Sequence, residues 1–203
     1  MQQKAIDLIK GWNHFDPSSI HEIPAFSTDW LSLSKSPLPK HISISRLQNG
    51  GDFLYYHSAI LISFQNSNSA NKDGQSLIYT PHGLPSSAKN PFASCKPPLK
   101  TLALLHGLHD VQIPWAGPFS SGTQQLNLGA HNALKLQRQI QAKYWLSTHD
   151  EVKKGGGLVG LILRRKVVTL EDALEGEKGL KEGGVREDVE VVDLENGRGM
   201  VLS

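Results

Sequence analysis

The chain lacks most features that quickly assign a sequence to a class of protein. Of its 203 residues only Cys95 is a cysteine, which excludes an internal disulfide and favours a reducing, cytoplasmic location. No apolar run approaches the roughly 20 residues needed to cross a bilayer, and the first residues do not predict a secretory signal. The 21 Lys and Arg residues exceed the 19 Asp and Glu residues by only +2, which argues against a nucleic-acid partner.

Two familiar catalytic sequences are also missing. No Gly-x-Ser-x-Gly string occurs, so the triad of an α/β-hydrolase is disfavoured. Lys153 and Lys154 precede three glycines as in a phosphate loop, but the Lys-Ser/Thr ending of a Walker sequence does not follow. We therefore interpret these two lysines as a basic loop that attracts an anionic substrate.

The periodicity of apolar residues predicts one α/β domain. Helical spacing occurs over residues 4–12 and 124–142, and Thr169 is placed to cap a further helix. Loops are expected over residues 85–98 and 111–124, and Arg164, Arg165 and Lys166 are interpreted as a solvated helix end. Alternating or short apolar segments predict strands in HISISRL and FLYYHSAILISF as a hairpin, then SLIYT, TLALL and YWLS, with DVEVVDL and GMVL as a terminal hairpin.

Histidine is the residue that the chain has in excess. There are nine, and four predicted strands end in or near one, at His57, His82, the pair His106/His109, and His149. A single histidine in a turn is usually only a polar side chain, but imidazoles from several strand ends can converge on zinc. The four positions together favour a metal site.

The segment YWLSTHDEVKKGGG carries the strongest functional signal. A short strand is expected to end in a turn that presents His149, Asp150 and Glu151, so that Asp150 orients a metal ligand or takes part in acid/base chemistry. Alternatively, Asp150 accepts hydrogen bonds from backbone donors as a helix cap does. His106 and His109, followed by Asp110, fit two metal ligands, metal-independent acid/base groups or an ordinary turn. His131 is expected on a helix face.

The segments GWNHF, LYYHSAILISF, LIYTPHG, LALLHGLHDV, LNLGAHNALKLQ and AKYWLSTHDEVKKGGGLV resemble fungal proteins of the metallo-β-lactamase superfamily, and the resemblance runs across nearly the whole chain. The related branch includes ascorbate-phosphate lactonases and phospholipase D-type hydrolases of N-acyl phosphatidylethanolamines. The resemblance implies an αββα sandwich of mixed sheets with helices on the outer faces. It also implies zinc at one edge, where metal-bound water attacks an ester, lactone or phosphodiester.

Individual residues match the superfamily pattern to different extents. His149 matches its last histidine ligand, and His82 stands where relatives end a strand in Gly-Asp with a metal-bridging aspartate. His57 corresponds to the middle ligand, with His41 as a competitor. The resemblance thus implies His57, His82 and His149 as metal ligands, with Asp150 as a catalytic residue beside them. We further expect Lys153, Lys154 and His109 to contact a small anionic or lipid-like substrate.

The main superfamily string, His-x-His-x-Asp-His, does not occur in these residues. Compared with the family, the chain therefore resembles a single domain (residues 1–203) that is shortened at its N-terminus. Two functions remain open: a metal-dependent hydrolase with impaired activity, or a non-catalytic relative that serves as a binding module. A missing layer would leave apolar strand positions uncovered, at about 1.5–3 kcal/mol per large side chain. We therefore expect a chain that is marginally stable, self-associates through the uncovered sheet or is partly disordered.

Overall fold

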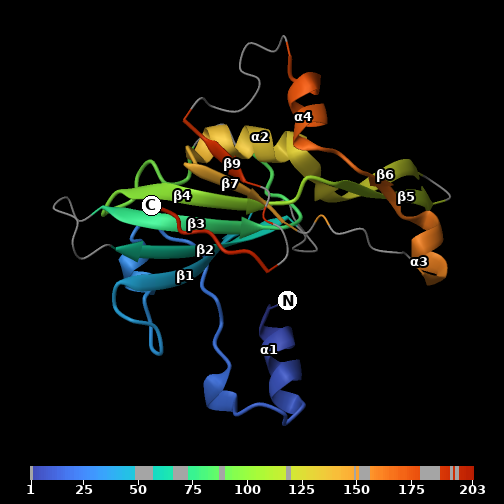
Figure 1. The fold of residues 1–203 in the computed structure, drawn as a ribbon. Coiled ribbons are helices and arrows are strands. Elements are labelled where there is room, and N and C mark those ends of the chain that lie inside the picture. The colour runs from blue at the N-terminus through green and yellow to red at the C-terminus, as the bar shows by residue number, and fades with distance from the viewer. Residues whose placement is uncertain are drawn as a thin grey trace.

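The computed structural model describes residues 2–48, 57–65, 73–86, 90–117, 120–148, 150, 156–178, 188–192, 194 and 197–203. In these residues helices and strands intermix along the chain, which confirms the α/β class (Figure 1). None of the helices that the structure describes has both the length and the apolar character needed to cross a membrane.

Six strands form the larger sheet, in the order β1-β2-β3-β4-β7-β9. The first three are antiparallel neighbours, and β3, β4, β7 and β9 run parallel. The predicted hairpin of the first two strands and the three strands after it are confirmed. Their bounds are β1 Ile42–Gln48, β2 Ser58–Gln65, β3 Gly74–Thr80, β4 Leu99–His106, β7 Tyr144–Ser147 and β9 Glu190–Val192.

The predicted terminal hairpin is wrong. The strand β9 pairs in parallel with β7, Tyr144 opposite Glu190, and residues 199–203 form no strand. Alternation within DVEVVDL indicates a strand but carries no information about its neighbour, because the partner lies more than 40 residues away in the chain. The last residues instead place Met200 and Leu202 in an apolar cluster with Leu102, Ala103 and Tyr144 of the larger sheet.

A second sheet replaces the loop expected over residues 111–124. It has the order β6-β5-β8, with β5 Asp110–Gly117, β6 Ser120–Leu128 and β8 Arg164–Lys166, all antiparallel. Proline and glycine in β5 suggested a loop. Pro114, however, lies beyond the three residues of β5 that pair with β8, so its missing N–H interrupts no hydrogen bond between these two strands. Arg164, Arg165 and Lys166 therefore lie in a strand and not at a helix end.

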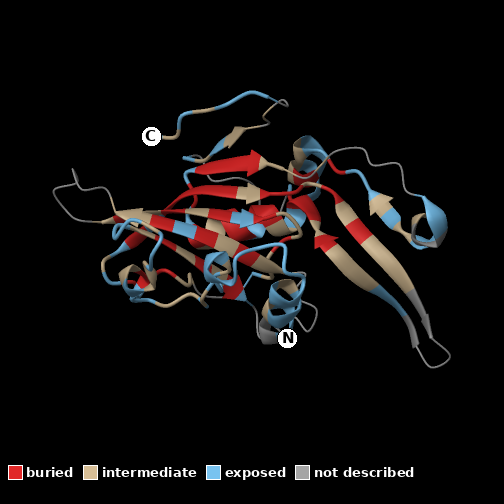
Figure 2. Cartoon of the chain, turned by 90° about the horizontal axis from the view of Figure 1, so that it is seen from below, coloured by how far each residue is buried: buried red, intermediate tan, exposed pale blue. Residues whose placement is uncertain are grey.

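One face of the larger sheet is covered by α2 (Gly129–Ile140), which begins later than predicted because residues 124–128 belong to β6. Its Ala133, Leu134 and Leu136 pack with Leu61, Ile78, Leu104 and Trp145 of the strands in the main core. Figure 2 shows buried positions concentrated in the strands of the larger sheet. The predicted first and last helices are confirmed as α1 (Gln2–Gly11) and α4 (Leu170–Gly176), and α3 (Gly157–Ile162) lies between β7 and β8.

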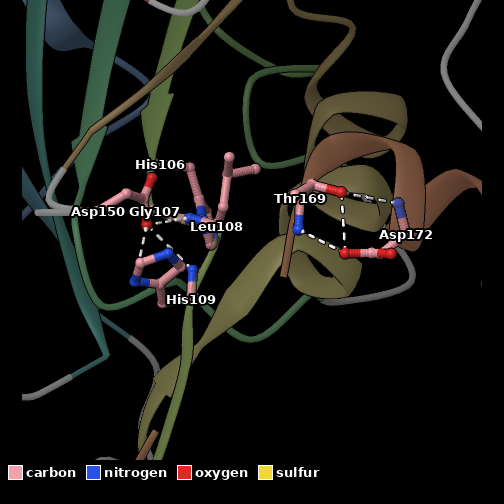
Figure 3. Close-up of polar contacts among 7 residues, drawn as sticks. All are labelled: His106, Gly107, Leu108, His109, Asp150, Thr169 and Asp172. Carbon is pink, nitrogen blue, oxygen red and sulfur yellow. Dashed lines mark hydrogen bonds and ion pairs between the residues drawn. The ribbon is translucent and has the colours of Figure 1, made fainter. Parts of the chain in front are cut away.

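The helix α4 begins as the sequence predicts. The Thr169 hydroxyl accepts from the Asp172 backbone N–H at 3.1 Å, and the Asp172 carboxylate accepts from the Thr169 N–H at 3.0 Å (Figure 3). This reciprocal pair lowers the pKa of Asp172, mainly through the backbone hydrogen bond from Thr169.

Candidate functional site

Strand ends from four parts of the chain meet at one edge of the larger sheet. The parallel strands β3, β4 and β7 end there, and the antiparallel strand β2 begins there, where the Thr80 hydroxyl donates to the Ser58 carbonyl at 3.2 Å. His57, His82 and His109 are therefore brought to the same edge. His41 lies at the opposite edge, where its carbonyl accepts from the N–H of Gln65, the last residue of β2. The structure thus favours His57 over His41 as a residue of this site.

Asp150 joins the loop after β7 to the loop after β4. Its Oδ1 atom accepts from the backbone N–H groups of Leu108 at 2.7 Å and His109 at 3.0 Å (Figure 3). Backbone donors were one of the two expectations for this carboxylate, although they come from a neighbouring loop and not from a helix. Two charge-assisted hydrogen bonds make Asp150 a positioning residue for the 107–109 loop.

Gly107 allows three loops to approach one another closely. A Cβ atom at this position would lie 2.9 Å from the Pro81 carbonyl oxygen and 3.1 Å from the Thr148 carbonyl oxygen. Both neighbours are backbone atoms and cannot rotate away. The glycine between the two histidines of HGLH is therefore required by space, since its backbone sits between the ends of β3 and β7.

His106 is completely buried beneath this edge. Its Nδ1 atom lies 2.6 Å from the Gly107 carbonyl, and Nε2 lies 2.9 Å from Oδ1 of Asn132 on α2. Burial lowers the pKa of His106, while the contacts with Asn132 and Gly107 and the negative charge of Asp150 act in the opposite direction. Asn132 also donates to the Leu84 carbonyl at 3.0 Å, so His106 and Asn132 connect β4 and α2 to the loop after β3.

His109 and Asp150 lie next to each other, and each carries a buried polar atom without a hydrogen-bond partner among the described residues, as His57 does at Nε2. The His109 Nδ1 atom and the Asp150 Oδ1 atom are 4.0 Å apart, and the two side chains are 8% and 20% exposed. Within the described part of the chain, His109 Nδ1 and Asp150 Oδ2 are buried and have no hydrogen-bond partner. Unsatisfied buried polar atoms are costly, so two of them on neighbouring side chains favour a place for a ligand or an ion.

The other expected site residues divide into two groups. His57 and His82 lie at the same edge and already interact with their surroundings, and His131 is exposed on α2 as predicted. Residues 149 and 151–155, which include His149, Lys153 and Lys154, lie outside the described residues. Within the described ranges no three histidine, cysteine or acidic side chains are close enough to hold a metal ion.

Other proteins give no guide to this site. Searches of known protein families, curated proteins and solved structures found no match to the chain. Sequence reasoning missed two of its residues: Asn132, which nothing distinguishes from other polar residues of an amphipathic helix, and Gly107, which is marked only by its position between two histidines.

Proposed function

We propose that the chain is a metallo-β-lactamase-like hydrolase whose zinc site lies at the edge where β3, β4 and β7 end. The observation that carries the proposal is the pair of buried, unsatisfied atoms His109 Nδ1 and Asp150 Oδ2. An imidazole nitrogen and a carboxylate oxygen are donors that zinc accepts in proteins. The resemblance in sequence adds His149, the residue directly before Asp150.

These donors fit a metal, because a cation would satisfy both atoms that lack partners. His109 Nδ1 and Asp150 Oδ2 would hold it together with His149, with His57 and His82 as further candidates from the neighbouring strand ends. Bound there, zinc supplies a Lewis acid that polarises an ester, lactone or phosphodiester. Asp150 Oδ1 keeps the 107–109 loop in place by accepting its two backbone hydrogen bonds, while Gly107 permits the close approach of the three loops.

The proposal extends to the fold and the substrate. The larger sheet with α2 on one face would form one half of an αββα sandwich. Lys153 and Lys154 follow Asp150 closely in sequence, which supports a small anionic or lipid-like substrate attracted by their charge.

Metal content per chain tests this function. We expect near-stoichiometric zinc in protein purified without a histidine tag, and loss of zinc together with hydrolysis in His109→Gln and in His149→Ala. His131→Gln is the matched control, because this histidine is exposed on α2 and should leave the zinc content unchanged. Absence of zinc from the unsubstituted chain, or equal zinc in His109→Gln and His131→Gln, would overturn the proposal.

A second candidate function is a non-catalytic binding module that associates with itself. One observation favours it: apolar side chains are left open on the sheet face opposite α2. Ile62 is 37% exposed and Tyr79 is 42% exposed. Both lie on the same face of the sheet as Leu77, which is covered because it packs in the cluster with Tyr144 and Leu146. A second copy of the chain would cover this face.

A further inference from the structure

A short stretch that includes α3 and β8 combines exposed apolar side chains with positive charge. Leu161 is 84% exposed, Ile162 is 49% exposed and Val167 is 61% exposed. Between them lie Arg164 and Lys166, which are also exposed, and residues 156–170 contain no acidic side chain. We call residues 161–167 the basic-apolar segment.

The basic-apolar segment lies at the outer edge of the smaller sheet. Among the strands that the structure describes, its strand β8 pairs with β5 alone, with Lys166 opposite Asp110 and Arg164 opposite Gln112. In Figure 1, α3 lies at the far end of the molecule from β1, and in Figure 2 its surface is exposed. Because β5 begins directly after His109, the segment is also connected to the candidate site.

The charges around the segment leave it basic. The nearest acidic groups described on the packed elements are Asp110 on β5, opposite Lys166, and Asp172 at the start of α4, which Lys166 stabilises in its charged form. These two acidic groups offset part of the positive charge of Lys166. Arg164, by contrast, lies opposite Gln112, which carries no charge. An anion would therefore be attracted mainly towards the Arg164 end, next to Leu161 and Ile162.

We propose that the basic-apolar segment binds the surface of an anionic lipid membrane. Apolar side chains at a membrane interface are buried among acyl chains, while neighbouring cations attract anionic headgroups. Nucleic acid would use the cations but would leave Leu161 and Ile162 in water. A second copy of the chain would bring the same cations together, which is unfavourable. The inference does not depend on the proposed hydrolysis, although a lipid surface beside the site suits a lipid-like substrate.

Cosedimentation of the full chain with vesicles tests this inference. We expect binding to vesicles of phosphatidylcholine with phosphatidylserine, little binding to phosphatidylcholine alone, and weaker binding as salt increases. The variant R164Q/K166Q should lower the partition coefficient about fivefold for each charge removed. Leu161→Ser should lower it about tenfold, because one large apolar side chain is no longer buried.

Matched controls separate these effects from general changes in charge and hydropathy. K35Q/K40Q removes two exposed lysines near β1, and Val201→Ser alters an apolar side chain that is 90% exposed in the last residues; both should bind as the unsubstituted chain does. Circular dichroism should show the same fold in every variant. Absence of binding, equal binding to both vesicle types, or unchanged binding of R164Q/K166Q would overturn the inference. Loss of oligonucleotide binding in R164Q/K166Q with unchanged vesicle binding would assign the cations to nucleic acid instead.

Discussion

Gly107 sets how closely the three loops of the candidate site can approach. We expect Gly107→Ala to destabilise the protein by about 1–3 kcal/mol, because its Cβ would meet the carbonyl oxygens of Pro81 and Thr148 and the backbone would have to move. Gly122→Ala is the control, since a Cβ there meets no atom within 4 Å. Urea denaturation of both variants measures the difference. Equal free energies of unfolding for the two variants would show that the loops can accommodate a Cβ at position 107, which would contradict this prediction.

His106 should make stability depend on pH. Burial lowers its pKa below the ordinary 6.5, so the unfolded chain binds a proton at a higher pH than the folded chain does. Unfolding then takes up a proton as the pH falls below about 6.5, and the free energy of unfolding decreases over that range. We expect this component to be absent from His106→Gln and present in His131→Gln. Parallel pH profiles of the unsubstituted chain and His106→Gln would contradict it.

The sequence predicted individual site residues better than their roles. The positions of His57, His82 and His109 at strand ends follow from local patterns, because the ends of β3 and β4 and the start of β2 meet at one edge. The hydrogen bonds from Leu108 and His109 to Asp150 could not be predicted, since they join residues about 40 positions apart. His149, Lys153 and Lys154 remain predictions.

At the scale of elements, an ion pair connects the end of α4 to α2. Arg138 lies 2.8 Å from the Glu177 carboxylate, whose side chain is only 3% exposed. Removing one partner of a buried pair is costly because the other charge stays in a dry environment, whereas replacing both by apolar residues often is not. We expect Arg138→Ala to lower the free energy of unfolding by about 3 kcal/mol, and R138M/E177L to lower it less. The reverse order in urea denaturation would be inconsistent with this account.

Elements with a clear period were predictable, and elements defined by distant partners were not. The strands β1 to β4 and β7 follow alternation or short apolar runs, and the start of α4 follows the Thr169 and Asp172 pair. Prolines, serines and glycines concealed β5 and the first half of β6, because such residues indicate loops in most contexts. The second half of β6 was predicted as helix, because its leucines continue the helical spacing of α2. The strand β8 is basic and short, and only its pairing with β5 reveals it.

At the scale of the whole molecule, the two faces of the larger sheet are covered unequally. The face opposite α2 keeps Ile62 and Tyr79 partly exposed, so we expect the chain to associate as its concentration rises. I62S/Y79S should shift the mass measured by light scattering towards that of a single chain, while Val201→Ser should not. A single-chain mass at every concentration would contradict this expectation.

The single cysteine, Cys95, can report how often the part of the core around it opens. Cys95 is buried among the main core residues, and burial raises the pKa of its thiol from 9.0 to about 11. Thiolate is the reactive form, so alkylation of the native protein near neutral pH should be at least about a hundredfold slower than that of an unfolded thiol. Because the chain has no second cysteine, the rate of labelling reports only on Cys95. It measures how often the segment around Phe92 and Cys95 leaves the core. Opening can thus be timed without introducing a probe or changing a residue.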